Sequence, residues 1–358
     1  MTLFLHVAHR ALRAFLGSLA AVVGLFLVVD FAENASAFRG PDWGRWALEL
    51  YANKVAVVAW QIGPAALLLA AAVTASGLRR TREYTAMRSL GLGPWRVAGP
   101  VLAVALAAGL AFAAFDDALV VAARARAEEI MAVRFHRGGA WQRWHEPKRW
   151  FRGRDGRRVY HLRGTGEGGA FERVTILELS DGFRLARRID AARMAPGPGG
   201  AWILTGVEER VFGPGETMEL RREERRTVRF DEDPDAFKVL PGRPAQMRRT
   251  ALHDQIALRR RLGLPVAEFV LEWHNKLAYP LAGVPAGLLA LALALRRERK
   301  GHLTAAITEA VAVSLLVWAA QGAAWSLGIS GRLPPVAAAW MPDAVFLVGG
   351  LWALRRVT

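Results

Sequence analysis

Cysteine is absent from the sequence, which excludes disulfide bonds, cysteine-ligated zinc and thiol chemistry. Lysine is scarce as well: only five of the 48 basic residues are lysines, and arginine supplies the others. No lysine follows a glycine, so the Gly-Lys-Ser/Thr end of a Walker A loop is missing. The H-E-x-x-H pattern of zinc peptidases and the G-x-S-x-G pattern of serine hydrolases are missing too. The chain therefore shows none of these common hydrolytic motifs.

The composition indicates a membrane protein with a polar part. Of the 358 residues, 53% are hydrophobic, and the mean hydropathy is +0.17. Such a chain is too apolar for an ordinary soluble protein and too charged for a bundle of membrane helices alone. The net charge of +16 comes almost wholly from arginine, and no zinc finger, RNP motif or basic zipper accompanies it to indicate nucleic-acid binding.

Six apolar runs have the length of membrane-spanning helices. About 20 helical residues cross the ~30 Å of hydrocarbon in a bilayer. The polar remainder is concentrated in one block, residues 124–268. We therefore predict three spans on each side of one polar domain, near residues 14–32, 55–76, 97–115, 277–295, 303–327 and 334–354.

Basic residues in the short loops predict the orientation, because they favour the cytoplasmic side. They gather in four segments: the N-terminus, residues 79–96, the RRERKGH loop after the fourth run, and the C-terminus. Residues 30–54, between the first two runs, hold three basic residues against four acids. All four basic segments fall on one side, so we predict that both termini are cytoplasmic and that residues 124–268 are extracytoplasmic.

An alternative for the first run is a secretory signal peptide, because Ala35-Ser36-Ala37 imitates an A-x-A cleavage site. The apolar run of about 16 residues is at the long end for such a peptide. Asp30 and Glu33 also stand just before the site. These two features favour a retained membrane span.

The polar block shows the alternation of β-strands. Its segments are rich in β-branched and aromatic residues with a period of two. Turn sequences separate them at residues 180–182 and 196–200. Short strands at this spacing predict an antiparallel sandwich or jelly roll. The strand segments read ERVTILEL, GFRLARRIDA and AWILTGVEERVF.

Residues 81–100, between the second and third runs, are more specified than a simple loop requires. Thr81 suits a helix N-cap and Gly91 suits a helix end, which predicts a helix over 82–90. Tyr84, Met87 and Leu90 recur every third residue and would form one apolar strip. Two interpretations stay open from this pattern alone: a helix resting on lipid headgroups, or a coupling helix inserted into a groove of a partner.

An ordered set of segments from about residue 5 to the C-terminus resembles the LptF/LptG family, the permeases of lipopolysaccharide export. No one segment is specific by itself, and the resemblance lies in their order along the chain. The family's cytoplasmic segment typically begins with a Glu that is followed by small and apolar residues and by Arg-x-x-Gly. A Pro then opens span three. Here this pattern spans residues 83–100. The other segments are VVDFAEN, IDAARM with WILTGVEERVF, EWHNKLAYPLAGVPAGLLALALALRRERKG, ITEAVAVSL and LPPVAAAWMPDAVFLVGGLWALRR.

The resemblance implies a helical membrane protein with six transmembrane helices and an inserted periplasmic β-jellyroll domain. The parts would be helices 1–3 with the coupling helix in 1–123, the jellyroll in 124–268, and helices 4–6 in 269–358. The chain would be a non-enzymatic subunit of an ABC transporter in the bacterial inner membrane, without metal or cofactor of its own. Its implied partners are an LptB-like ATPase dimer that holds ATP and Mg, a second LptF/LptG-type permease, LptC- and LptA-like periplasmic jellyroll proteins, and lipopolysaccharide.

The resemblance also implies two sets of site residues. It implies that the helix over residues 82–90 is a coupling helix that binds the ATPase. The residues implied in this contact are Arg82, Glu83, Tyr84, Ala86, Met87, Arg88, Leu90 and Gly91. Lipid would enter between spans one and five, past cations near the outer end of span one. The candidates are Arg39, Arg45 and Lys54 for phosphates, and Leu25, Phe26, Val29, Val317, Trp318, Gln321 and Trp325 for the cavity wall.

Alternatives remain for these positions and for the whole chain. The three cations also suit a solvated loop, and the wall residues also suit lipid contact or helix packing. Glu272, His274 and Lys276 suit an interfacial belt with Trp273 and Tyr279, Asp343 suits helix capping, and Glu309 is a lone charge inside span five. Two other function classes remain for the whole chain. One is a mechanotransmitting ABC subunit, which is expected to have four spans instead of six. The other is a membrane sensor, which is expected to carry a cytoplasmic effector domain.

Overall fold

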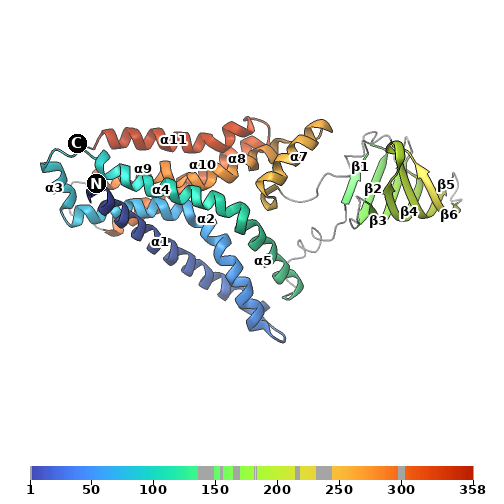
Figure 1. Ribbon diagram of the computed structural model, residues 1–358, viewed down its shortest axis with the longest axis horizontal. Coiled ribbons are helices and arrows are strands. Elements are labelled where there is room, and N and C mark those ends of the chain that lie inside the picture. The colour runs from blue at the N-terminus through green and yellow to red at the C-terminus, as the bar shows by residue number, and fades with distance from the viewer. Residues whose placement is uncertain are drawn as a thin grey trace. The chain divides into compact units, whose positions relative to one another are not determined.

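The computed structural model describes residues 2–357 except 136–148, 154–155, 164–169, 181, 183, 214–217, 231–243 and 297–302. The chain divides into two compact units (Figure 1). A helical unit comprises residues 1–135, 244–256 and 265–358, and a sheet unit comprises residues 136–243 and 257–264. The sheet unit is narrower than the block 124–268 of the sequence, because α5 prolongs the third apolar segment to Val133 and part of α7 belongs with the helices.

The helical unit contains the long apolar helices. They are α1 (Thr2–Asn34), α2 (Trp43–Arg80), α4 (Trp95–Phe115), α5 (Val121–Val133), α8 (Ala267–Leu281), α9 (Gly283–Arg296), α10 (Leu303–Ile329) and α11 (Pro335–Arg355). The short α3 (Glu83–Ser89) follows α2, a π-helical turn (Asp116–Val120) joins α4 to α5, and α7 (Arg249–Arg261) precedes α8. Single 3-10 turns lie at Ala35–Ala37 and Pro244–Gln246.

Six helical segments of the described residues are long and apolar enough to cross a membrane, as predicted. The first four are clearly longer than the apolar runs from which they were predicted, and the last two agree with theirs to within two residues. The third extends from Trp95 to Val133 and the fourth from Ala267 to Arg296, so each continues beyond its uncharged part. The chain is therefore a multi-pass helical membrane protein with an inserted β unit.

Small residues let the helices approach closely. A side chain at Gly109 of α4 would stand 2.9 Å from the carbonyl oxygen of Pro280, and one at Gly63 of α2 would meet the ring of Phe112. Close approach through glycine and alanine is the usual way in which membrane helices pack, because lipid gives no hydrophobic drive for their association. The core formed this way contains Ala71, Ala75, Leu78, Val97, Ala98, Leu291 and Leu354, among others.

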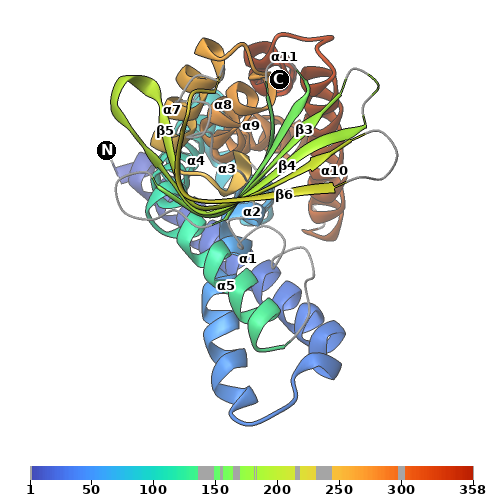
Figure 2. The ribbon, with the colours of Figure 1, turned by 90° about the vertical axis from the view of Figure 1, so that its right-hand side faces the viewer.

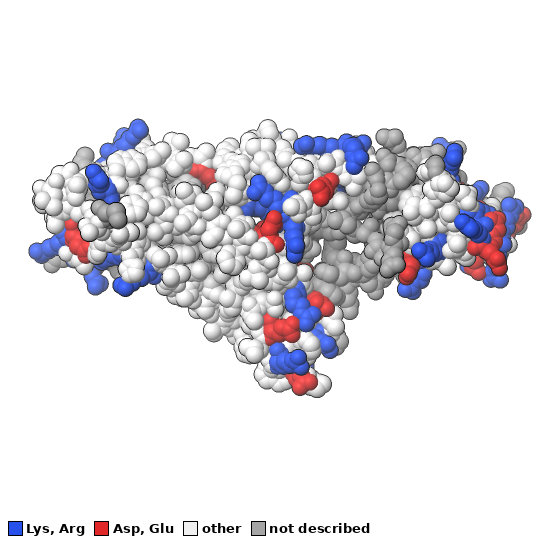
Figure 3. Space-filling model, viewed as in Figure 1, with Lys and Arg blue, Asp and Glu red and all other residues white. Residues whose placement is uncertain are grey.

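The two ends of the helical unit differ in what they bring together. At one end, Val7 of α1, Tyr84 of α3 and Val357 pack into one cluster, so α3 and both chain termini lie side by side (Figure 1). At the other end, Phe38, Leu50 and Ile130 join the end of α1, the start of α2 and α5. On the face seen in Figure 3, lysines and arginines gather at the end that holds α3, and a largely uncharged stretch follows it.

The sheet unit is one curved antiparallel sheet of six strands in the order β1-β2-β3-β4-β5-β6 (Figure 2). Its strands are β1 (Arg149–Arg152), β2 (Arg158–Arg163), β3 (Phe171–Leu179), β4 (Leu185–Pro196), β5 (Trp202–Phe212) and β6 (Met218–Val228). The three strand segments read from the sequence are confirmed as β3, β4 and β5. Alternate residues of the sheet, including Tyr160, Ile176 and Leu204, form its apolar core.

Candidate functional site

The short helix α3 is the first candidate site. It covers Glu83–Ser89, one residue less at each end than the predicted helix. The prediction that Thr81 is its N-cap is wrong: Thr81 is the C-cap of α2, and its backbone N–H donates to the carbonyl of Gly77 at 3.0 Å. Arg82 stands at the N-cap with a positive φ of 61° and no side-chain cap. A turn of two residues, Thr81 and Arg82, thus joins α2 to α3.

Glu83 ties α3 to the first two spans. Its carboxylate accepts hydrogen bonds from Thr81 Oγ1 at 2.6 Å and Arg10 Nη1 at 2.7 Å, and it lies 3.0 Å from His6 Nε2. The hydrogen bond from Thr81, together with those from His6 and Arg10, lowers the pKa of Glu83 to about 2. This residue therefore remains ionised and holds α3 against the N-terminal half of α1.

The predicted apolar strip on α3 is divided between the core and the surface. Tyr84 and Met87 are 5% and 7% exposed and pack among the membrane helices, whereas Leu90 is 78% exposed. Leu92 N donates to Met87 O and Gly91 N to Arg88 O, with Gly91 at φ +75°, which is the bonding of a Schellman end. Because Tyr84 and Met87 face inward, the exposed face of this segment consists of Arg82, Thr85, Ala86, Arg88, Ser89 and Leu90.

The three candidate cations have different surroundings. Arg39 and Arg45 are exposed in and after the turn that joins α1 to α2. Lys54 is held in place: its Nζ lies 2.5 Å from Asp30 Oδ2, and the same carboxylate oxygen accepts a hydrogen bond from Tyr51 at 2.8 Å. The charge of Lys54 is thus already neutralised inside the protein, and Arg39 and Arg45 are the cations open to a ligand.

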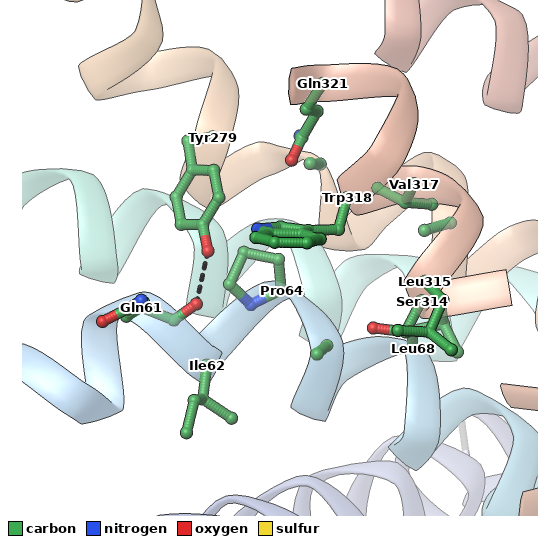
Figure 4. A pocket seen from close by; sticks show the side chains of 13 residues that line it. Gln61, Ile62, Pro64, Leu68, Tyr279, Ser314, Leu315, Val317, Trp318 and Gln321 are labelled. Carbon is green, nitrogen blue, oxygen red and sulfur yellow. Dashed lines mark hydrogen bonds between the residues drawn. The ribbon is translucent and has the colours of Figure 1, made fainter. Parts of the chain in front are cut away.

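The predicted wall residues fall into three places. Leu25, Phe26 and Val29 are all exposed along the C-terminal half of α1. Val317, Trp318 and Gln321 of α10 line a common cavity (Figure 4). Trp325 packs near Leu271, Ala338 and Ala339 instead. Helix α2 contacts both α1 and α10.

The cavity beside α10 lies among α2, α8, α9 and α10 and has a volume of about 210 Å³. Its walls are mostly apolar, with Gln61, Ser314, Gln321 and Tyr279 as polar groups. Tyr279 donates its hydroxyl hydrogen to the carbonyl of Gln61 (Figure 4). The exposed ring of Trp318 forms part of the cavity wall. This volume lies below the roughly 300–1,000 Å³ of pockets that enclose a drug-sized ligand, so the cavity holds at most part of a large lipid.

A buried ionic cluster is the feature that the sequence interpretation missed. Lys276 Nζ of α8 lies 2.5 Å from Asp116 Oδ2 and 3.9 Å from Asp117 Oδ1. The side chains of Lys276 and Asp116 are only 4% and 5% exposed, and Glu272, one turn earlier on α8, is 5% exposed. The predicted interfacial belt is therefore wrong for Glu272 and Lys276, because both are enclosed by protein.

The cluster also fixes the path of the third span. Asp116 and Asp117 begin the π-helical turn, and Asp117 Oδ1 accepts a hydrogen bond from the backbone N of Arg249 at 2.8 Å, at the start of α7. Such π-turns are frequent at functional positions. Two sequence patterns could have indicated this cluster, because a charge buried in a membrane protein requires a partner. They are the adjacent acids Asp116 and Asp117 at the end of the third apolar run, and the i, i+4 pair Glu272 and Lys276.

Two other predictions about acids have a mixed outcome. Asp343 lies inside α11, eight residues after its start, so the prediction that it caps a helix is wrong. Glu309 lies within α10. Among the described residues there is no group of three His, Asp or Glu side chains arranged for a metal ion. The expectation that the chain binds no metal or cofactor stays a prediction.

Comparison with protein families gives one match, described as "Lipopolysaccharide export system permease LptF/LptG", over residues 6–356. No curated protein matches the sequence. The family match covers both halves of the helical unit and the whole sheet unit.

Proposed function

Because the chain belongs to the LptF/LptG family of lipopolysaccharide export permeases, we propose that it extracts lipopolysaccharide from the bacterial inner membrane as one permease subunit of an ABC transporter. The observation that carries this proposal is the family match over residues 6–356. The six membrane-type helices of the structure agree with it. Because the chain lacks a Walker A loop, a separate LptB-like ATPase dimer would bind ATP and Mg.

The coupling role falls to α3. This helix lies with both termini at the end of the unit where arginines gather, which the loop charges predict to be cytoplasmic (Figure 3). Glu83 connects it to α1 and α2 through three side chains, and Tyr84 and Met87 anchor it in the helical core. A push on Arg82, Arg88 or Leu90 by an ATPase would therefore move the spans as well as the short helix.

The substrate role falls to the exposed outer half of α1 and to the exposed side of α10. Leu25, Phe26 and Trp318 are 66%, 44% and 71% exposed in the single chain. A second LptF/LptG-type subunit facing these surfaces would enclose a larger apolar cavity, in which acyl chains contact Leu25, Phe26, Val29 and the α10 residues. Phosphates would pair with Arg39 and Arg45, whereas Lys54 positions the end of α1 by holding Asp30.

The sheet unit is proposed to be a periplasmic jellyroll that receives the lipid. The described strands form an antiparallel sheet with β1 and β6 at its two edges. An edge strand can accept a strand of another sheet by hydrogen bonding of the backbones. LptC- or LptA-like jellyroll proteins would extend the sheet in this way. The proposed domain division is the predicted one, with 124–268 on the periplasmic side and both termini in the cytoplasm.

The test is co-purification of the tagged chain from its native membrane, followed by identification of bound proteins and lipid by mass spectrometry. Wild type is expected to retain a small ATPase and lipopolysaccharide. An Arg88→Glu, Leu90→Ser variant changes only exposed side chains of α3 and is expected to lose the ATPase. Arg13→Glu is the matched control, because Arg13 is exposed at the same end of the unit but lies on α1. Absence of an ATPase from the crosslinked wild type would contradict the proposal.

A further inference from the structure

A second cavity, of about 220 Å³, lies between α1 and α2 at the end of the helical unit that holds α3. Its polar lining consists of Arg10, Thr74, Ser76, Arg80 and Thr81. Ala14 and Val73 supply apolar wall, and the neighbouring α1 residues Leu12 and Leu16 are 43% and 54% exposed. The cavity thus combines two guanidinium groups with hydroxyl groups at the margin of an apolar helix surface.

Thr74 gives the first sign of a missing ligand. The residue is 1% exposed, and its hydroxyl oxygen is buried without a hydrogen-bond partner in the described part of the chain. Buried polar side-chain atoms nearly always have a partner, and an unsatisfied one calls for an explanation. A ligand oxygen in the cavity would supply the missing hydrogen bond, since Thr74 is part of the cavity wall.

The two arginines give the second sign. Arg10 uses Nη1 for Glu83, while its Nη2 and Nε lie over Gly77 of α2. A Cβ at Gly77 would stand 2.9 Å from Nη2 and 3.3 Å from Nε, so glycine leaves the space for this arginine. Arg80 is exposed, and no hydrogen bond or ion pair to another described residue is seen for its side chain. Glu83 pairs with Arg10, and no carboxylate lines the cavity itself among the described residues, so the two guanidinium groups leave a net positive charge there.

We propose that this cavity binds the phosphate group of an anionic membrane phospholipid, held by Arg10, Arg80 and the Thr74 hydroxyl. Planar guanidinium groups bind phosphate through paired charge-assisted hydrogen bonds. The apolar wall of Ala14 and Val73, on helices that span the membrane by length and composition, favours a lipid over a soluble phosphate. The site lies at the opposite end of α1 from the surface proposed for lipopolysaccharide, and it does not depend on that proposal.

The experiment uses the full-length protein, purified in detergent and stripped of lipid, and measures binding by native mass spectrometry. The probes are phosphatidylglycerol, phosphatidylcholine and inorganic phosphate. Wild type is expected to bind one phosphatidylglycerol at least about ten times more tightly than phosphatidylcholine, because only the former keeps a net negative headgroup. Arg80→Gln and Thr74→Val are expected to reduce this preference several-fold, while Arg13→Gln, an exposed arginine of α1 outside the cavity, keeps it.

Thermal unfolding separates a lost ligand from a damaged fold. Thr74→Val removes an unpaired buried hydroxyl, so the lipid-free variant is expected to unfold at or above the wild-type temperature. Phosphatidylglycerol should then stabilise wild type and Arg13→Gln more than it stabilises Thr74→Val. If inorganic phosphate alone saturates the site and phosphatidylglycerol adds nothing, the lipid assignment is overturned. Equal binding of the two lipids, or equal effects of Arg13→Gln and Arg80→Gln, would overturn the site itself.

Discussion

Replacement of Lys276 by methionine is expected to destabilise the helical unit strongly. The substitution keeps an unbranched side chain of similar length but removes the cation that lies 2.5 Å from Asp116 Oδ2. Because the Asp116 side chain is only 5% exposed, its carboxylate would be left buried without a partner. Glu272 lies one turn before Lys276 on α8, is also 5% exposed, and adds a second acid to the site. Removing one partner of such a buried pair costs about 3–5 kcal/mol.

The chain supplies a matched control for this prediction. Lys54 and Asp30 also approach to 2.5 Å, but both side chains are 19% exposed, so water can solvate the remaining carboxylate. Lys54→Met is therefore expected to cost about 1 kcal/mol or somewhat more, closer to the range of exposed pairs. Residue types and distance are the same in the two pairs, but Tyr51 still donates to Asp30 after the substitution, so the difference in cost reports both burial and the remaining hydrogen-bond donor.

The assay is unfolding of the detergent-purified variants by sodium dodecyl sulfate, followed by intrinsic tryptophan fluorescence. A Lys276→Met, Asp116→Asn double variant completes the cycle and is expected to recover most of the loss, with a coupling energy of about 2–3 kcal/mol. A cost below about 1 kcal/mol for Lys276→Met alone, or a double variant no more stable than the single one, would show that Lys276 and Asp116 do not form a buried, mutually dependent pair.

Three further predictions concern α3 and the helix contacts. Met87→Ala truncates a side chain that is 7% exposed and should lower the free energy of unfolding by about 2–5 kcal/mol. Leu90 is 78% exposed, so Leu90→Ala should change the free energy of unfolding by less than about 0.5 kcal/mol. Unfolding titrations compare the two variants. The pKa of Glu83 is lowered from 4.5 to about 2. The ionised carboxylate therefore contributes fully to the free energy of unfolding above pH 4.5, and this contribution is lost as the pH falls towards 2. Glu83→Gln should remove this pH-dependent contribution, about 1 kcal/mol after solvent screening, in unfolding titrations between pH 6 and 3. Gly109→Ala would place a Cβ 2.9 Å from the Pro280 carbonyl oxygen and is expected to cost about 1–3 kcal/mol; an unchanged unfolding midpoint would show that α4 and α8 pack less closely than described.

Long-range charge pairing explains the largest gap between the sequence and the site. The apolar runs predicted the six spans, and period-two alternation predicted β3 to β5, because both signals are local. Asp116 and Lys276 are 160 residues apart, and nothing local shows that they meet. Lys276 was predicted to lie in an interfacial belt because the nearby Trp273 and Tyr279 are typical of a membrane interface.

The α3 region shows a second kind of gap, where a local pattern was overruled by packing. Thr81 fits an N-cap by residue type, but α2 extends to Arg80 and takes Thr81 as its own C-cap. Tyr84, Met87 and Leu90 share a three-residue spacing, yet the core accepts the first two and leaves Leu90 in solvent. The Gly91 helix end was predictable, because the positive φ that it adopts favours glycine.

The most direct test of lipopolysaccharide extraction is photo-crosslinking in living cells. A benzophenone amino acid is placed at Phe26 of α1, at Trp318 of α10, or at Leu106 of α4, which is 47% exposed and lies outside the proposed substrate surfaces. If the chain extracts lipopolysaccharide along the proposed surfaces, adducts are expected at Phe26 and Trp318 but not at Leu106, and their yield is expected to change when cellular ATP is depleted. Absence of adducts at both substrate positions, or equal adducts at all three, would contradict extraction along these surfaces.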